Sequence, residues 1–368
     1  MKRILFLTNY PSPYRVNFFD TLGKLAQVTV LYSDRKEKKQ HRSKNWFVAG
    51  EGKFEAVQLK KRVLSVKGRD LCTDVVDWLK KPWDAIIIHG YGTPTQIYAM
   101  GWLRRHHIPY YLEVDGGLIR QDGKFKHFLK QKIVDGASVW LSTGSYTTDY
   151  LCHYGAVRER CFPFPFSSLW EKDLLPEMPT VSRKEEARRK LQMGEEKILL
   201  SIGQFIPRKG FDVLMEAAKE LPRNVGIYII GGEPTEEYVQ LQKSLPQVHF
   251  VGFQKKEDLK QYYLAADLFV LPTREDIWGL VINEAMAFGL PVITTDRCVA
   301  GLELVENGVN GFIVPAGQAE PLKKAMLDTL SMDLRAMGEA SLQRIRPYTI
   351  ENMAKVHMDI LNERGSGL

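Results

Sequence analysis

The 368-residue sequence has few cysteines, no long apolar run and no low-complexity tract. No stretch approaches the roughly 18 consecutive apolar residues that a membrane-spanning helix needs. The opening "MKRILFLTNYPSPYR" has too short an apolar run for a signal peptide and lacks a small-residue cleavage site. The four cysteines have no metal-ligand spacing and fit reduced thiols of a cytoplasmic protein. They are Cys72, Cys152, Cys161 and Cys298.

Basic residues are in excess, with a formal net charge of +7. They gather in "DRKEKKQHRSKNW" (34–46) and in "RQDGKFKHFLKQKIV" (120–134). The second stretch has a helical pattern with Phe125, Phe128 and Leu129 on one side, which suits an anionic membrane surface. The alternative is a surface helix that packs these residues into its own core. Nucleic acid is a weaker candidate, because no recognisable binding module surrounds either cluster.

Short apolar strands alternate with helices along most of the chain. The first series runs from "KRILFLTN" through "DAIIIHGYG" and "IPYYLEVDG" to "SVWLSTG", and a second runs from "KILLSIGQF" to "GFIVPAG". Such alternation predicts parallel sheets covered by helices on both faces. The length suits two domains. We therefore expect an α/β protein with two doubly wound domains facing a central cleft, where ligands bind.

The domain boundaries follow from a break in this alternation. Residues 163–195 are rich in proline and charge, which is typical of a connection. The predicted organisation is an N-terminal domain over 1–165, a connection over 166–195 and a C-terminal domain over 196–345. The last stretch, 346–368, is expected to be a helix that crosses back to the first domain.

Two acids stand out in "REDIWGLVINEAMAFGLPVITTD" (274–296). Glu284 lies in an apolar stretch that reads as a buried helix, where an unpartnered carboxylate costs several kcal/mol. It needs donors, either from the protein or from a pair of ligand hydroxyls such as a ribose diol. Asp276 precedes the same helix, where it could be an N-cap. Gly279 then opens the first helical amides to an anion.

A counterpart is the loop "IPRKG" (206–210). Arg208 and Lys209 come directly before a predicted helix, where cations oppose the helix dipole by roughly 0.3–1 kcal/mol each. Their placement makes sense if they face a bound diphosphate. The alternative is that they are two solvated loop charges.

These motifs together resemble the donor-binding half of family 4 glycosyltransferases of the GT-B fold, built from two Rossmann-like domains. The resemblance rests on "GQFIPRKGFDVLMEA", "IIGGEP", "VGF", "EDIWGLVINEAMAFGLPVITTD" and "LVENGVNGFIVP", in this order. It covers roughly residues 195–335 closely and 1–165 in outline, through "NYPSPYRVNFF" and the order of strands. The spacing from Asp276 to Glu284 matches the signature in which two acids are separated by seven residues.

The resemblance implies retaining, metal-independent transfer of a sugar from a UDP- or GDP-sugar, without a cofactor. Arg208 and Lys209 would bind the diphosphate, Glu284 the ribose, and Asp276 the donor sugar. Many family members have Glu where this chain has Asp276 preceded by Glu275, so either acid could reach the sugar. The remaining donor-site residues implied by the family are Gly203, Gly252, Phe253, Gly279, Leu280 and Val281.

The acceptor is expected in the N-terminal half, where loops at strand ends carry polar residues. A histidine is often found in one of these loops in the family, whereas this chain has the acids of "LEVDGG" there. The acceptor would be a saccharide or a polyprenyl-linked sugar of cell-surface polysaccharide synthesis. The expected location is cytoplasmic, with peripheral attachment to the inner face of the membrane. The candidate acceptor residues are Asn9, Tyr14, Arg15, His89, Glu113 and Asp115.

Two other functions remain open from the sequence. One is a nucleotide-sugar epimerase of the same fold, and the other is a nucleotide-sugar-binding protein without catalysis. A dinucleotide dehydrogenase is disfavoured, since no G-x-G-x-x-G follows the first strand of either half. The sequence names neither the nucleotide, the sugar nor the acceptor.

Overall fold

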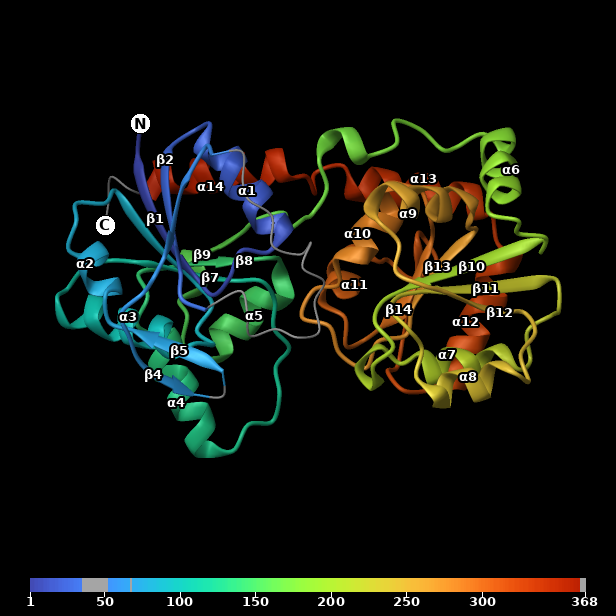
Figure 1. Ribbon diagram of the computed structural model, residues 1–368, viewed down its shortest axis with the longest axis horizontal. Coiled ribbons are helices and arrows are strands. Elements are labelled where there is room, and N and C mark those ends of the chain that lie inside the picture. Colours follow the sequence, from blue (N-terminus) through green and yellow to red (C-terminus); the bar gives the residue numbers. More distant parts are fainter. Residues whose placement is uncertain (35–51, 67, 365–368) are drawn as a thin grey trace. The chain divides into compact units, whose positions relative to one another are not determined.

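The computed structural model describes residues 1–34, 52–66 and 68–364. The chain divides into two compact units: Met1–Ser168 with Tyr348–Leu368, and Leu169–Pro347. Each unit has a parallel sheet with helices on both faces (Figure 1). Apart from Asp34, the basic cluster at 34–46 lies outside the described residues. The α/β fold class predicted from the sequence is confirmed, and the cleft between the domains stays a prediction.

The first unit contains a seven-stranded sheet in which every pairing is parallel. Most of its strands are nearly continuous apolar runs, such as "RILFLT", because helices exclude water from both faces. In spatial order the strands are β3 (Glu55–Gln58), β2 (Gln27–Tyr32), β1 (Arg3–Thr8), β6 (Ala85–His89), β7 (Tyr111–Val114), β8 (Val139–Ser142) and β9 (Cys161–Pro163).

Alternate residues of β1 serve two separate cores. Phe6 packs edge-on against Phe18 and Phe19, so this face lies under α1 and its neighbour α14. Leu5 and Leu7 join the cluster on the other face, which contains residues of α2, α3 and α5. A hairpin of β4 (Arg62–Val66) and β5 (Arg69–Cys72) contacts α3. The helices are α1 (Pro13–Gly23), α2 (Val75–Leu79), α3 (Pro94–Arg105), α4 (Lys124–Val134), α5 (Ser145–His153) and α14 (Ile350–Arg364).

The second unit has a six-stranded sheet, again parallel throughout. Its order is β12 (Val248–Val251), β11 (Val225–Ile230), β10 (Lys197–Ile202), β13 (Leu268–Leu271), β14 (Val292–Thr295) and β15 (Gly311–Val314).

Helices cover both faces of this sheet. Residues of α7, α8 and α12 join one face in a single core, while α9 and α10 contact the sheet from the other (Figure 1). The helices are α6 (Val181–Lys190), α7 (Phe211–Ala218), α8 (Glu236–Gln242), α9 (Lys256–Ala265), α10 (Leu280–Ala287), α11 (Val299–Leu304), α12 (Ala319–Ser331) and α13 (Leu334–Ile345).

Most of the segment predicted as a connection, 166–195, is built into the second unit, which begins at Leu169. Asp173 pairs with Lys256 at 2.6 Å and Lys260 at 3.1 Å, both on α9. Farther along, α6 packs on α9, and Asp267 receives cations of α6 at 2.6 and 2.5 Å. Its proline and charge content therefore reflects irregular backbone and ion pairs on a folded unit.

In each sheet the strand order reverses beside the first strand of the unit. β1 lies between β2 and β6, and β10 lies between β11 and β13. In open α/β sheets, ligands bind at the carboxyl ends of the strands at such a reversal. Each unit therefore has one position at which a site is expected.

Candidate functional site

The loop after β10 meets the loop after β13 at close range. A short 3₁₀ turn, Pro207–Lys209, ends at Gly210, whose φ is 69°. A Cβ at Gly210 would lie 2.1 Å from the carbonyl oxygen of Pro272, so this crossing requires glycine. Arg274 locks the loops further, because its backbone N–H donates to the Arg208 carbonyl at 2.8 Å. The result is that cations of the first loop face acids of the second.

The cations converge on one carboxylate. Lys209 Nζ lies 2.6 Å from Asp276 Oδ2, and the side chains are only 12% and 13% exposed. Arg208 Nη1 lies 3.4 Å from Asp276 Oδ1 and donates to the Glu275 carbonyl at 2.7 Å. Asp276 thus holds two cations, and these three side chains together carry one net positive charge. That charge balance suits an anionic ligand.

Helix α10 begins directly behind this cluster. Gly279 is its N-cap, with φ 105° and no side-chain cap on the first amides. A Cβ there would lie 2.8 Å from Cys298 Sγ. The first N–H groups of a helix lack intrahelical partners and favour anions. The N–H groups of Leu280 and Val281 are therefore placed for the anion-binding role predicted for them.

Glu284 lies one turn further along α10 and is half-buried rather than enclosed. Tyr263 of α9 donates a hydrogen bond from its hydroxyl to Glu284 Oε2 at 2.9 Å. The protein therefore supplies at least one of the hydrogen-bond donors that were expected for Glu284. A carboxylate has about four acceptor positions, and the Tyr263 hydroxyl occupies one of them.

Three other predicted donor residues lie elsewhere along the same sheet edge. Gly203 follows β10 beside Lys209, whose side chain would lie 3.3 Å from a Cβ at that glycine. Gly252 and Phe253 follow the edge strand β12, two strands away from β10. Phe253 is 72% exposed, so its ring is available for stacking.

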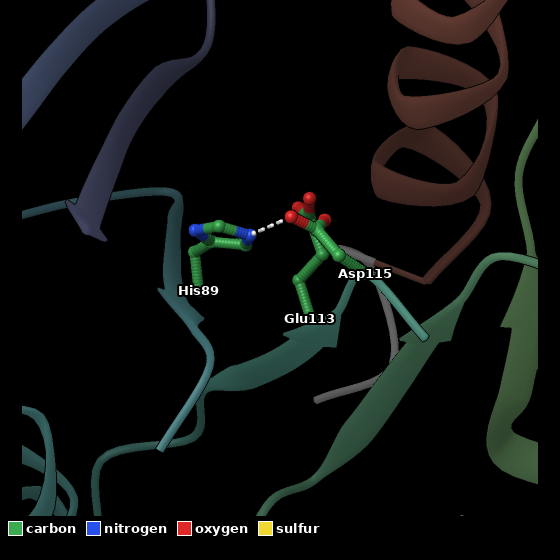
Figure 2. A group of neighbouring side chains, drawn as sticks. All are labelled: His89, Glu113 and Asp115. Carbon is green, nitrogen blue, oxygen red and sulfur yellow. Dashed lines mark ion pairs between the residues drawn. The ribbon is translucent and has the colours of Figure 1, made fainter. Parts of the chain in front are cut away.

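In the first unit, polar residues of α1 and of the carboxyl ends of β1, β6 and β7 form a second cluster, which is largely buried. Arg15 Nη1 lies 2.5 Å from Glu113 Oε1, and Nη2 bonds Asp115. His89 Nε2 lies 3.0 Å from Asp115 Oδ2, as Figure 2 shows, and His89 Nδ1 lies 2.9 Å from Thr8 Oγ1. These side chains come together because β1, β6 and β7 are adjacent.

The burial of this cluster changes the role of two predicted acceptor residues. Arg15 and Glu113 are almost completely buried, and Glu113 Oε2 also lies 3.3 Å from His357 Nε2 of α14. Burial opposes the charge on Glu113, but the Arg15 guanidinium and then His357 hold its pKa below the usual range. Direct contact of Arg15 or Glu113 with an acceptor does not fit this burial. They tie α1, β7 and α14 together instead.

The other acceptor candidates keep more access. His89 and Asp115 are partly exposed. Asn9 accepts a hydrogen bond from the Tyr10 backbone N–H at 2.8 Å, which shapes the loop after β1. Tyr14 packs edge-on against Phe166, and burial raises the pKa of its hydroxyl, with Asp115 adding to the effect. We therefore retain His89 and Asp115 as the best placed of the predicted set.

His89, Glu113 and Asp115 are also a possible ligand set for a metal ion, since their ligating atoms lie within 4.8 Å of one another. However, Arg15 contacts both carboxylates and lies 2.8 Å from His89 Nε2. Its guanidinium supplies the positive charge that these groups would otherwise seek from a cation.

Sequence reasoning missed Tyr263 and His357. Tyr263 is one of two consecutive tyrosines in a helix, and nothing in that pattern points to an acid 21 residues later. His357 reaches Glu113 from 244 positions away. Only the folded sheets bring these pairs together.

Solved structures identify the fold. Sucrose-phosphate synthase from Thermosynechococcus elongatus aligns with a TM-score of 0.77 and 19% identity over the whole of both chains. The Anabaena protein HepE in complex with UDP aligns with a TM-score of 0.76 and 17% identity, covering 99% of this chain and all of HepE. The protein therefore has the GT-B fold of glycosyltransferases.

A sequence match to a known family covers somewhat less than half of the chain. Residues 183–347 match the family Glycosyl transferases group 1. This match falls on the part of the chain that carries the closest resemblance, and it agrees with what the resemblance implied.

Individual relatives align over part of their length. An uncharacterized glycosyltransferase of Haemophilus influenzae is 34% identical over 145 residues, which are 38% of this chain and 41% of that protein. The lipopolysaccharide glucosyltransferase WaaG of Escherichia coli is 29% identical over 242 residues, which are 62% and 64% of the two chains. The chain thus spans from about two fifths to two thirds of these relatives.

Proposed function

We propose that the protein is a retaining glycosyltransferase that moves a sugar from a UDP- or GDP-sugar to a saccharide or lipid-linked acceptor in cell-surface polysaccharide synthesis. The observation that carries the proposal is the grouping of Arg208, Lys209 and Asp276 in front of the α10 N-terminus. The family match supports the reaction class. WaaG and the UDP-bound HepE support the acceptor and donor classes.

The charges of the site suit departure of a nucleoside diphosphate. Breaking the bond between the anomeric carbon and the phosphate oxygen leaves negative charge on the diphosphate and positive charge on the sugar. Lys209, Arg208 and the α10 amides would stabilise that negative charge in a fixed, partly buried setting. Lys209 would exchange part of its contact with Asp276 for the phosphate.

The two acids would then contact the donor itself. Glu284 would accept hydrogen bonds from the ribose hydroxyls, and Asp276 or Glu275 would accept them from the sugar. Asp276 already holds Lys209, so it would link the sugar to the leaving group. We further propose that the departing phosphate oxygen takes the acceptor proton on the same face of the sugar. The configuration would then be retained without a separate base or a metal ion.

The acceptor would bind at the carboxyl edge of the first sheet, near His89 and Asp115. This part of the proposal rests on their partial exposure at the strand reversal beside β1. Arg15 and Glu113 would act behind them by fixing their positions.

The proposal includes attachment to an anionic membrane through α4. Phe125 is 76% exposed and Phe128 51% exposed, so the alternative that they pack into the core does not hold in the structure. Lys126 and Lys132 are exposed beside them, and both Lys126 and the less exposed Lys130 contact Asp122 at 2.7 Å. Exposed aromatics among lysines suit the interface of an anionic bilayer. No helix among the described residues is both long and apolar enough to cross a membrane.

The test is a thermal-shift panel of UDP-, GDP-, ADP- and dTDP-sugars with the matching nucleotides, followed by turnover with and without EDTA. Ligand binding to the folded state raises the melting temperature. We expect one nucleotide family to bind, with EDTA-resistant transfer that releases the nucleotide. Conversion of the donor sugar without an acceptor would favour the epimerase. Binding without any turnover would favour the non-catalytic protein.

A further inference from the structure

Tyr263 is placed to act on Glu284 from a neighbouring helix. Its hydroxyl lies 2.9 Å from Glu284 Oε2, and its side chain is almost fully buried. Burial, followed by the charge of Glu284, raises the pKa of Tyr263 well above its ordinary value. The hydroxyl therefore keeps its proton and donates to the carboxylate.

The position of this hydroxyl is fixed by packing on two sides. The Tyr263 ring stacks on Phe288, which follows α10, with centroids 5.3 Å apart and planes 14° apart. The ring of Phe269 on β13 also lies near the Tyr263 ring, with centroids 6.2 Å apart. Helix α9 is itself held by Asp173 through Lys256 and Lys260. A donor on so constrained a ring has little freedom to follow the carboxylate, so the carboxylate must follow the donor.

Glu284, by contrast, has a flexible side chain and only partial burial. Immobilising such a side chain on ligand binding costs conformational free energy, and restraining it beforehand removes part of that cost. The hydrogen bond to Oε2 restrains the carboxylate and takes only one of its roughly four acceptor positions.

We propose that Tyr263 is a positioning residue that orients Glu284 for the ribose diol of the nucleotide. This inference rests on the proposed function, because it assigns a ribose to Glu284. Tyr263 itself would contact no ligand. Its effect should therefore depend on whether the ligand has ribose hydroxyls.

The experiment compares wild type with Tyr263→Phe, which keeps the stacked ring and removes one hydroxyl. Calorimetry would measure the affinity of UDP and GDP, and of their 2′,3′-dideoxy analogues. Tyr262→Phe is the matched control, because it removes the hydroxyl of the preceding residue on the same helix. We expect Tyr263→Phe to weaken binding of the natural nucleotide about tenfold. It should change binding of the dideoxy analogue less than about twofold, and Tyr262→Phe should change neither.

A second comparison separates positioning from general stability. In a Glu284→Ala background, adding Tyr263→Phe should no longer alter nucleotide affinity, because the residue that it positions is gone. Equal loss of natural and dideoxy nucleotide in Tyr263→Phe would show a structural role and overturn the inference. Unchanged binding of the natural nucleotide would overturn it as well.

The same data separate this inference from the function on which it rests. If wild type binds the natural and the dideoxy nucleotide equally, Glu284 does not hold a ribose. The proposed role of Tyr263 is then wrong, whereas nucleotide binding itself is supported. If wild type binds no nucleotide at all, the proposed function fails and the inference with it.

Discussion

The two units share one strand order around their first strand but use it for different charge arrangements. In the second unit, one acid, Asp276, holds two cations that remain partly accessible. In the first, one buried cation, Arg15, is held by two acids. An arrangement with surplus cations at the edge of a sheet suits an anionic ligand, whereas a buried cation that is paired with two carboxylates suits a structural joint. The same position in a fold can therefore serve binding or cohesion.

The largest expected effect is a loss of stability of the first unit. Arg15→Met should destabilise it by about 3–5 kcal/mol, because removing the cation leaves buried carboxylates unpaired. Urea unfolding of the whole protein measures this. Arg158→Met is the control, since that pair with Asp149 is exposed and should matter little. If Arg15→Met unfolds at the same urea concentration as wild type, Arg15 does not stabilise the first unit, and the structural role assigned to it is wrong.

Substitutions at the site of the second unit should lower turnover rather than stability. Lys209→Ala is expected to lower the transfer rate about 10²- to 10³-fold, because a fixed charge at the leaving group is lost. Arg208→Ala should lower turnover more than donor affinity. Steady-state kinetics measure both, with Lys219→Ala on the outer end of α7 as the control. A loss of donor affinity alone would argue against leaving-group stabilisation.

Glu284→Ala tests whether the acid of α10 serves the ligand or the fold. We expect donor affinity to fall about 100-fold, since two charge-assisted hydrogen bonds are lost. The melting temperature should fall only modestly, because the carboxylate is half-buried and the main cost is that the buried Tyr263 hydroxyl loses its acceptor. Titration calorimetry and thermal melting check the two parts. Marked unfolding with unchanged donor affinity would assign Glu284 to the fold, as with Glu113.

Helix α4 of the first unit carries exposed aromatic residues, which are expected to bind an anionic membrane. Phe125→Ser with Phe128→Ser should weaken binding to anionic vesicles about tenfold or more. Co-sedimentation with phosphatidylserine vesicles measures this, with phosphatidylcholine vesicles as the lipid control. Ile97→Ser with Tyr98→Ser removes exposed apolar groups of α3 and should have no effect. Equal binding to both lipids would contradict the electrostatic part.

The smallest effect concerns acid stability. The pKa of Glu113 is lowered in the folded state from an ordinary value of 4.5, and that of Asp115 from 3.8. Their contribution to stability is thus complete above about pH 4.5 and is lost as the pH falls through the folded values. Melting between pH 7 and 3 should show this loss in wild type and a weaker one in Glu113→Gln. A constant melting temperature down to pH 3 would contradict it.

The donor loops could be found from the sequence because their signals are local. A proline opens the turn at 207, glycines end it and cap α10, and acids and cations lie within short motifs. The fold class could also be predicted, because an apolar strand is recognised from consecutive residues. The edge strands β3 and β9 and the β4–β5 hairpin were missed, since short strands with partly exposed residues lack a continuous apolar run.

The sequence by itself determined the class of fold, the motifs that match the group 1 family, and the candidate residues in the loops after β10 and β13. Only the tertiary structure decided that Glu284 receives the Tyr263 hydroxyl, that Arg15 and Glu113 are buried, and that Phe125 is exposed. The physical reason is distance along the chain. Backbone turns and strand patterns depend on neighbouring residues, whereas the partner of a charge and the burial of a ring depend on which segments the sheets bring together.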